Sequence, residues 1–141
     1  MMIHAAEAKR TTGWIAIFCL ALGLLCSSAA LAGEAPPAPE MPANWKIISD
    51  WSVPAQQVSA MSAKLGADLS SVRNTVYDVN GHRVQLNLIV TPDPANAAKL
   101  MNKLKSIKTE EALLRKGLAI YEFVGQNDAL PAIAQGRKHL Q

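Results

Sequence analysis

The sequence has little cysteine, few aromatic residues and no familiar catalytic motif. Its two cysteines, Cys19 and Cys26, both lie in the apolar N-terminal segment. If that segment is removed, the remaining chain cannot be a thiol oxidoreductase, a cysteine hydrolase or a thiolate metal site. Neither a Gly-x-Ser-x-Gly motif nor a glycine-rich phosphate loop occurs. These absences favour a non-enzymatic protein.

Charge and aromatic content also limit the class of partner. The net charge is +3 and aromatic residues make up 5% of the chain. A nucleic-acid-binding surface combines clustered basic residues with aromatic side chains between them. The sequence therefore predicts no nucleic-acid partner.

The first 32 residues have the three-part layout of a secretory signal peptide. Lys9 and Arg10 precede the apolar run 14–26, and Ala30 and Ala32 supply small residues at the cleavage site. The run is shorter than the roughly 20 residues that a membrane-spanning helix needs. We expect export to the periplasm or the exterior, with cleavage after Ala32. The alternative is an uncleaved signal, and only that form would be held at a membrane.

After the signal we expect a Pro-rich linker over residues 33–44 and a single domain over residues 45–141. The linker reads GEAPPAPEMPAN, and its prolines favour an extended spacer or a free tail. Hydrophobic periodicity in the domain predicts alternating strands and helices. The expected elements are a strand over 45–53, a helix over 54–65, a hairpin of strands 69–79 and 82–91, a helix from 94, a short helix over 109–116, a strand over 118–124 and a helix after 128.

Apart from the short helix, this order is β-α-β-β-α-β-α and resembles the ferredoxin-like arrangement. It predicts an α+β fold, a two-layer sandwich in which helices cover one face of a mostly antiparallel sheet. In the first strand, Trp45, Ile47, Trp51 and Val53 share one parity and are expected to form its buried face.

The hairpin turn between Asp78 and Gly81 allows two registers. A two-residue Asn-Gly turn would set Val76 opposite Gln85, whereas a three-residue loop would pair Val76 with Val84. The second register collects valines and leucines on one face and polar residues on the other. Because a one-residue slip inverts the faces of a strand, we predict the second register.

Glu122 interrupts the otherwise apolar strand 118–124. Edge strands commonly carry charges, so the favoured interpretation is an edge strand with Glu122 in water. If Glu122 is buried, its carboxylate needs a partner such as Arg73 or Arg83. Glu122, Tyr77 and Arg73 would then form a polar constellation suited to a small ligand.

One concentration of positive charge lies on and after the helix from residue 94. It is formed by Lys99, Lys103, Lys105 and Lys108. We interpret these lysines as a solvated helix face, with contact to an acidic partner or anionic head groups as the alternative. His82 and His139 lack the clustered partners of a metal ligand or a general base, so no metal or cofactor is predicted.

Together these observations predict an exported, non-enzymatic domain that binds another envelope or secreted protein. A sheet edge, the lysine-rich helix or the polar face of the hairpin would make the contact. The alternatives are a small-ligand carrier or hydrolase at Glu122, Tyr77 and Arg73, and a protease propeptide-like inhibitor, which the element order and small size suggest.

Overall fold

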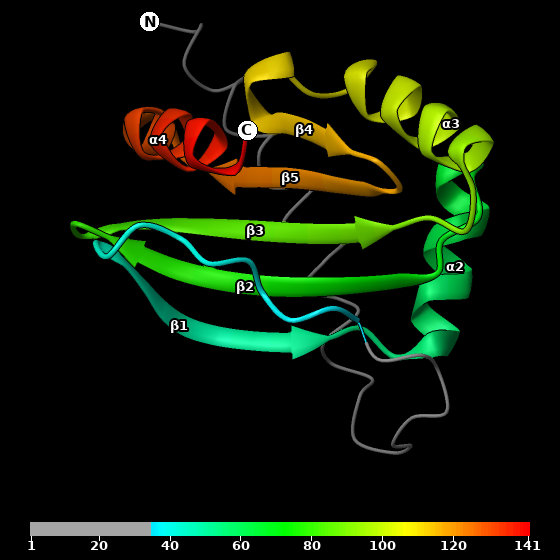
Figure 1. The fold of residues 1–141 in the computed structure, drawn as a ribbon, viewed down its shortest axis with the longest axis horizontal. Helices are drawn as coiled ribbons and strands as arrows, with labels where there is room; N and C mark the ends of the chain where they lie inside the picture. The colour runs from blue at the N-terminus through cyan, green and yellow to red at the C-terminus, as the bar shows by residue number, and fades with distance from the viewer. Residues whose placement is uncertain (1–34) are drawn as a thin grey trace, which may run out of the picture. The chain divides into compact units, whose positions relative to one another are not determined.

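A five-stranded sheet in the order β1-β2-β3-β5-β4 forms the centre of the computed structural model, which describes residues 35–141 (Figure 1). The strands are β1 (Trp45–Ser52), β2 (Ser71–Val79), β3 (His82–Val90), β4 (Leu113–Lys116) and β5 (Ala119–Gly125). The helices are α2 (Ala55–Leu65), α3 (Pro94–Lys105) and α4 (Leu130–Leu140), with 3-10 turns η1 (Glu110–Ala112) and η2 (Asn127–Ala129). The predicted α+β class is confirmed.

Every neighbouring pair of strands is antiparallel, and β1 lies at one edge of the sheet. A split βαβ unit requires parallel strands, so the likeness to the ferredoxin-like arrangement is limited to the order of elements. The short helix expected over 109–116 was wrong. Only η1 is helical there, and β4 follows it because Gly117, at φ 62, turns the chain back into β5.

The β2–β3 hairpin adopts the register that the sequence analysis rejected. Val76 faces Gln85 and Tyr77 faces Val84. Asn80 and Gly81 have φ values of 54 and 89, as a two-residue type I′ turn requires. The prediction failed because it assumed one polar face, whereas both faces of this hairpin are covered.

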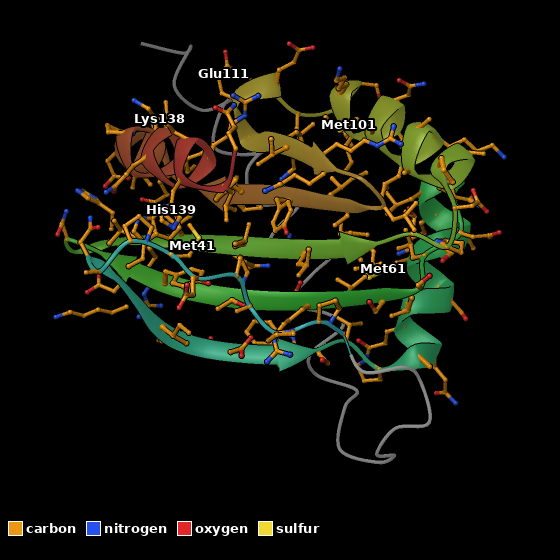
Figure 2. All side chains as sticks on the ribbon, viewed as in Figure 1. Met41, Met61, Met101, Glu111, Lys138 and His139 are labelled. Carbon is orange, nitrogen blue, oxygen red and sulfur yellow. The ribbon has the colours of Figure 1, made fainter. Side chains whose placement is uncertain are left out.

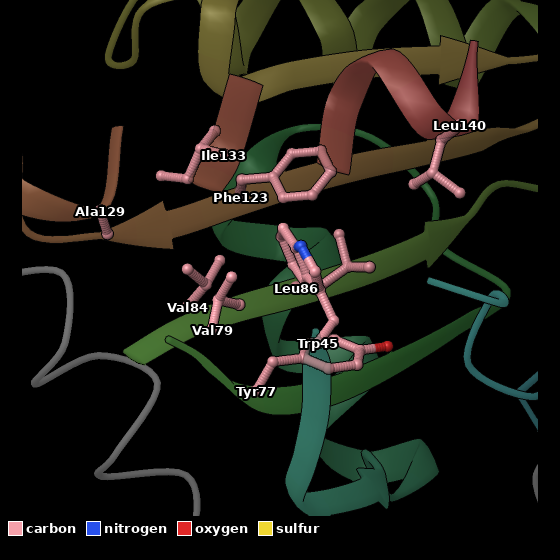
Figure 3. Packing of buried hydrophobic residues seen from close by; sticks show 9 residues of the cluster. All are labelled: Trp45, Tyr77, Val79, Val84, Leu86, Phe123, Ala129, Ile133 and Leu140. Carbon is pink, nitrogen blue, oxygen red and sulfur yellow. The ribbon is translucent and has the colours of Figure 1, made fainter. Parts of the chain in front are cut away.

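Two hydrophobic clusters lie on opposite faces of the sheet. In β3, Val84 and Leu86 belong to one cluster and Ile89 to the other, and residues an odd number of positions apart in a strand point to opposite faces. One face, here the α4 face, packs against α4 (Figure 3). The other, the α2/α3 face, packs against α2 and α3. Helices therefore cover both faces and not one. The α4 cluster is Trp45, Tyr77, Val79, Val84, Leu86, Phe123, Ala129, Ile133 and Leu140. The α2/α3 cluster is Val53, Val58, Ala67, Val72, Ile89, Leu100, Leu104, Leu113 and Ile120.

Residues 35–44, which we call the strap, run extended across the strands before β1 begins (Figure 1). The prolines account for the extended form. Met41 packs against the α4 cluster, and the Glu40 carbonyl oxygen lies 3.1 Å from His139 Nε2. The sequence did not predict these contacts, since it suggested only a spacer or a free tail.

The expected signal peptide, its cleavage site and the alternative anchor lie outside the described residues. Within residues 35–141, no helix has the length and apolar character needed to cross a membrane.

Candidate functional site

The structure does not bring the three residues of the predicted polar constellation together. Arg73 and Tyr77 lie four positions apart along β2, so both side chains are on the α4 face. Glu122 lies in β5 next to Phe123, whose ring belongs to the α4 cluster, so its carboxylate points to the opposite face. These residues share no site for a small ligand.

Glu122 is buried, with 1% of its surface exposed, because β5 lies between β3 and β4. The expectation of an exposed edge residue was therefore wrong. Its carboxylate has a partner, but neither Arg73 nor Arg83 supplies it. Lys108 Nζ lies 2.6 Å from Glu122 Oε1, and Asn87 Nδ2 donates to the same oxygen at 3.4 Å.

Lys108 reaches Glu122 because the chain keeps a helical turn beyond α3. The Lys108 N–H donates to the Leu104 carbonyl at 2.8 Å, which places Lys108 one turn after a buried leucine. The spacing of four residues from Leu104 was the available signal, since it continues the apolar stripe. Lys99, Lys103 and Lys105 are exposed, so only these three of the four predicted lysines face solvent.

Polar side chains form a buried row across the α2/α3 face. Asn74, Asn87 and Glu122 are cross-strand neighbours on β2, β3 and β5. Gln85 Nε2 donates to Asn87 Oδ1 at 2.7 Å, whereas Asn74 Oδ1 has no hydrogen-bond partner among the described residues. Burying these polar side chains costs free energy unless they contact one another, and they do so only when the three strands are correctly aligned. We therefore interpret the row as a determinant of strand register.

A second polar network lies on the α4 face beside the aromatic rings. Arg73 donates to both carboxylate oxygens of Asp50, at 2.7 and 2.5 Å, and Thr75 donates to Asp50 Oδ1 at 2.9 Å. The hydrogen bonds from Arg73 are the largest cause of the lowered pKa of Asp50. Burial is the largest cause of the raised pKa of Tyr77, and the Asp50 charge adds to it.

The two histidines of the described chain make separate contacts. His82 Nδ1 lies 3.1 Å from Asp128 Oδ2, and His139 contacts the strap. No group of three or more histidine, cysteine or acidic side chains in residues 35–141 could hold a metal ion.

The two edges of the sheet differ in what they offer a partner. β1 has eight residues and pairs only with β2 among the described strands. It exposes 58% of Ile47 and 49% of Ile48. At the other edge, β4 has four residues, and Arg137 Nε donates to its Leu113 carbonyl at 3.0 Å. The free surface is therefore concentrated on β1.

A β-bulge in β1 divides the residues that the sequence analysis placed on one buried face. Ile47 pairs with Tyr77 and Ser49 with Val76, so Ile48 is an extra residue. Trp45 consequently lies on the α4 face, whereas Trp51, opposite Asn74, lies on the other. Alternation along the sequence cannot be followed through a bulge.

Comparison with known proteins adds no information on function, because no protein-family model, curated protein or solved structure matches the chain. The inference on function rests on the chain's own geometry.

Proposed function

We propose that this chain is a binding domain that takes an extended segment of another exported protein as an additional strand beside β1. The exposed edge of β1, with two isoleucine side chains in water, is the observation that carries the proposal. Main-chain hydrogen bonds along a free edge supply affinity, and the alternating side chains supply specificity. The expectation that the partner is exported rests on the N-terminal sequence alone.

The bulge at Ile48 favours a single partner strand over open-ended stacking. Natural sheets use bulges and charged side chains to keep edges from pairing indiscriminately. β1 has both features, because Lys46 precedes the two isoleucines and is itself exposed. A partner strand must match the bulge, which limits the sequences that fit.

Two observations favour a protein partner over a small ligand. Glu122 lies on the opposite face from Tyr77 and Arg73, so the carrier or hydrolase hypothesis has no converging set of side chains. Two isoleucines exposed side by side on an edge are, in contrast, suited to contact with another chain.

Site-specific photocrosslinking tests the proposal. A photoreactive residue at position 48 should capture a partner in the host, and the same residue at position 130 should not. Leu130 is the matched control because it is 54% exposed but lies on α4. With the purified partner, Ile48→Lys should weaken binding at least tenfold, or about 1.4 kcal/mol.

The control variants decide between surfaces. Leu130→Lys and the double variant Lys99→Glu/Lys103→Glu should leave the dissociation constant unchanged. If the double variant Lys99→Glu/Lys103→Glu abolishes binding while Ile48→Lys has no effect, the partner docks on α3 and the β1 proposal is wrong.

A further inference from the structure

The strap contacts the body of the domain as a bound peptide contacts its receptor. Side chains from two elements approach its main-chain carbonyls: Arg73 of β2 donates to Pro36 at 3.5 Å, and His139 of α4 lies 3.1 Å from the Glu40 oxygen. A proline-rich extended segment forms no internal hydrogen bonds, so its carbonyls are available to such donors. The body therefore recognises the strap partly through its backbone.

Met41 is the side-chain anchor of the strap (Figure 2). It packs against the α4 cluster where Gly136 provides space. A Cβ atom at Gly136 would lie 3.0 Å from Met41 Cε and 2.6 Å from the Trp45 ring. The absence of a side chain at Gly136 thus creates the seat for Met41.

A single turn joins the strap to the body. The Trp45 N–H donates to the Pro42 carbonyl at 2.9 Å, and two hydrogen bonds of 3.2 Å join the Asn44 and Gln135 amides. If this turn opens, the strap extends β1 away from the body, and its seat on the α4 face becomes vacant. A strap from another copy would restore the contacts of residues 35–42 with the α4 face. The hydrogen bond within the opened turn would be lost, and exchange has a low cost when the other contacts are regained.

We infer that two copies of this chain exchange straps, each placing residues 35–42 on the α4 face of the other. A second copy is the occupant we choose because the chain's own strap is the segment that fits the seat. Four prolines at 36, 37, 39 and 42 limit the freedom that the strap loses when it docks again. The inference is independent of the β1 edge.

Disulfide trapping between differently marked chains tests the exchange. The full chain, with Cys19 and Cys26 replaced by serine, is made as two variants, Glu40→Cys and His139→Cys. Both positions are exposed and adjacent in the structure. After mixing and mild oxidation, we expect a disulfide-linked heterodimer that forms on the order of tenfold faster than with Leu130→Cys in place of His139→Cys.

The double variant Glu40→Cys/His139→Cys provides the geometric control. Oxidised at high dilution before mixing, where each strap lies on its own body, it should form an intrachain disulfide, which also locks the strap and prevents exchange with added Glu40→Cys chains. If the intrachain disulfide forms while mixed chains crosslink no faster than the Leu130→Cys pair, the strap stays on its own body and the inference is overturned. Neither outcome depends on a β1 partner, so failure here leaves the proposed function intact.

Discussion

The α4 face of the sheet buries three aromatic rings, whereas the α2/α3 face buries aliphatic side chains beside an ion pair. On the α4 face, the Asp50–Arg73 pair is partly open to water, with side chains 25% and 21% exposed. On the α2/α3 face, the Glu122 side chain is buried from water, with 1% of its surface exposed. The same kind of contact therefore has different consequences, because water screens the first pair and cannot compensate the loss of a partner in the second.

The largest expected effect comes from breaking the buried pair. Lys108→Met leaves the Glu122 carboxylate without its cation and should lower the free energy of unfolding by about 3–5 kcal/mol. The matched variant on the other face, Arg73→Met, should cost about 1 kcal/mol or less. Urea titration of both at neutral pH makes the comparison. Adding Glu122→Gln to Lys108→Met should recover part of the loss, and equal losses for the two single variants would contradict the contrast.

Crowding the aromatic cluster should have the next largest effect. Gly136→Ala places a methyl group 2.6 Å from the Trp45 ring, and overpacking of this kind costs about 1–3 kcal/mol. Alanine is the better helix former by about 1 kcal/mol, so a net loss in thermal or urea stability would show that the clash dominates. Ala134→Ser, exposed on the same helix, is the control and should change little. A stabilised Gly136→Ala variant would contradict the tight packing.

The exposed pair should produce a modest dependence on pH. The pKa of Asp50 is lowered in the folded state, chiefly by its hydrogen bonds from Arg73. Its stabilising contribution is therefore present above the unfolded pKa of about 3.9 and is lost as the pH falls through the folded value. Asp50→Asn should flatten the stability profile in that acidic range and leave its shape near neutral pH unchanged. If stability falls with decreasing pH as steeply in Asp50→Asn as in the original protein, the Asp50–Arg73 pair does not contribute to the acid dependence.

The smallest effect is expected at the Tyr77 hydroxyl, which is buried without a hydrogen-bond partner among residues 35–141. Tyr77→Phe removes an unpaired polar group and should leave stability unchanged or raise it by up to about 1 kcal/mol. In an alkaline titration followed by absorbance, the Tyr77 hydroxyl should ionise at a higher pH than an ordinary tyrosine, because its pKa is raised. The Tyr77→Phe variant should lose this late absorbance change. A loss of more than 1 kcal/mol would indicate that the hydroxyl does have a partner.

The differences between the predicted and observed sites come from contacts between distant residues. Glu122 was recognised as unusual, but its partner Lys108 was assigned to a solvated face, because charge alone does not show which way a helix end turns. The hairpin register was misjudged for a similar reason. The polarity of Gln85 and Asn87 suggested a solvent face on β3, whereas the structure buries Asn87 completely.

The predicted ends of the helices lie close to the observed ones where neighbouring residues decide the outcome. Asp93 caps α3 by accepting the Asn96 N–H at 2.8 Å, and Gly66 ends α2 in the left-handed conformation at φ 68. Asn80 and Gly81 form a turn, although its register was misassigned. Each of these features depends on residues within a few positions of one another.

The sequence by itself determined the α+β class and most of the helices and strands, because hydrophobic period, caps and turn residues act over short distances. Only the tertiary structure decided which strands are neighbours, that both faces are covered, that Lys108 neutralises Glu122 and that the strap lies on the α4 face. These outcomes depend on the burial of side chains far apart in the chain, and a linear pattern of polar and apolar residues does not specify which of them meet.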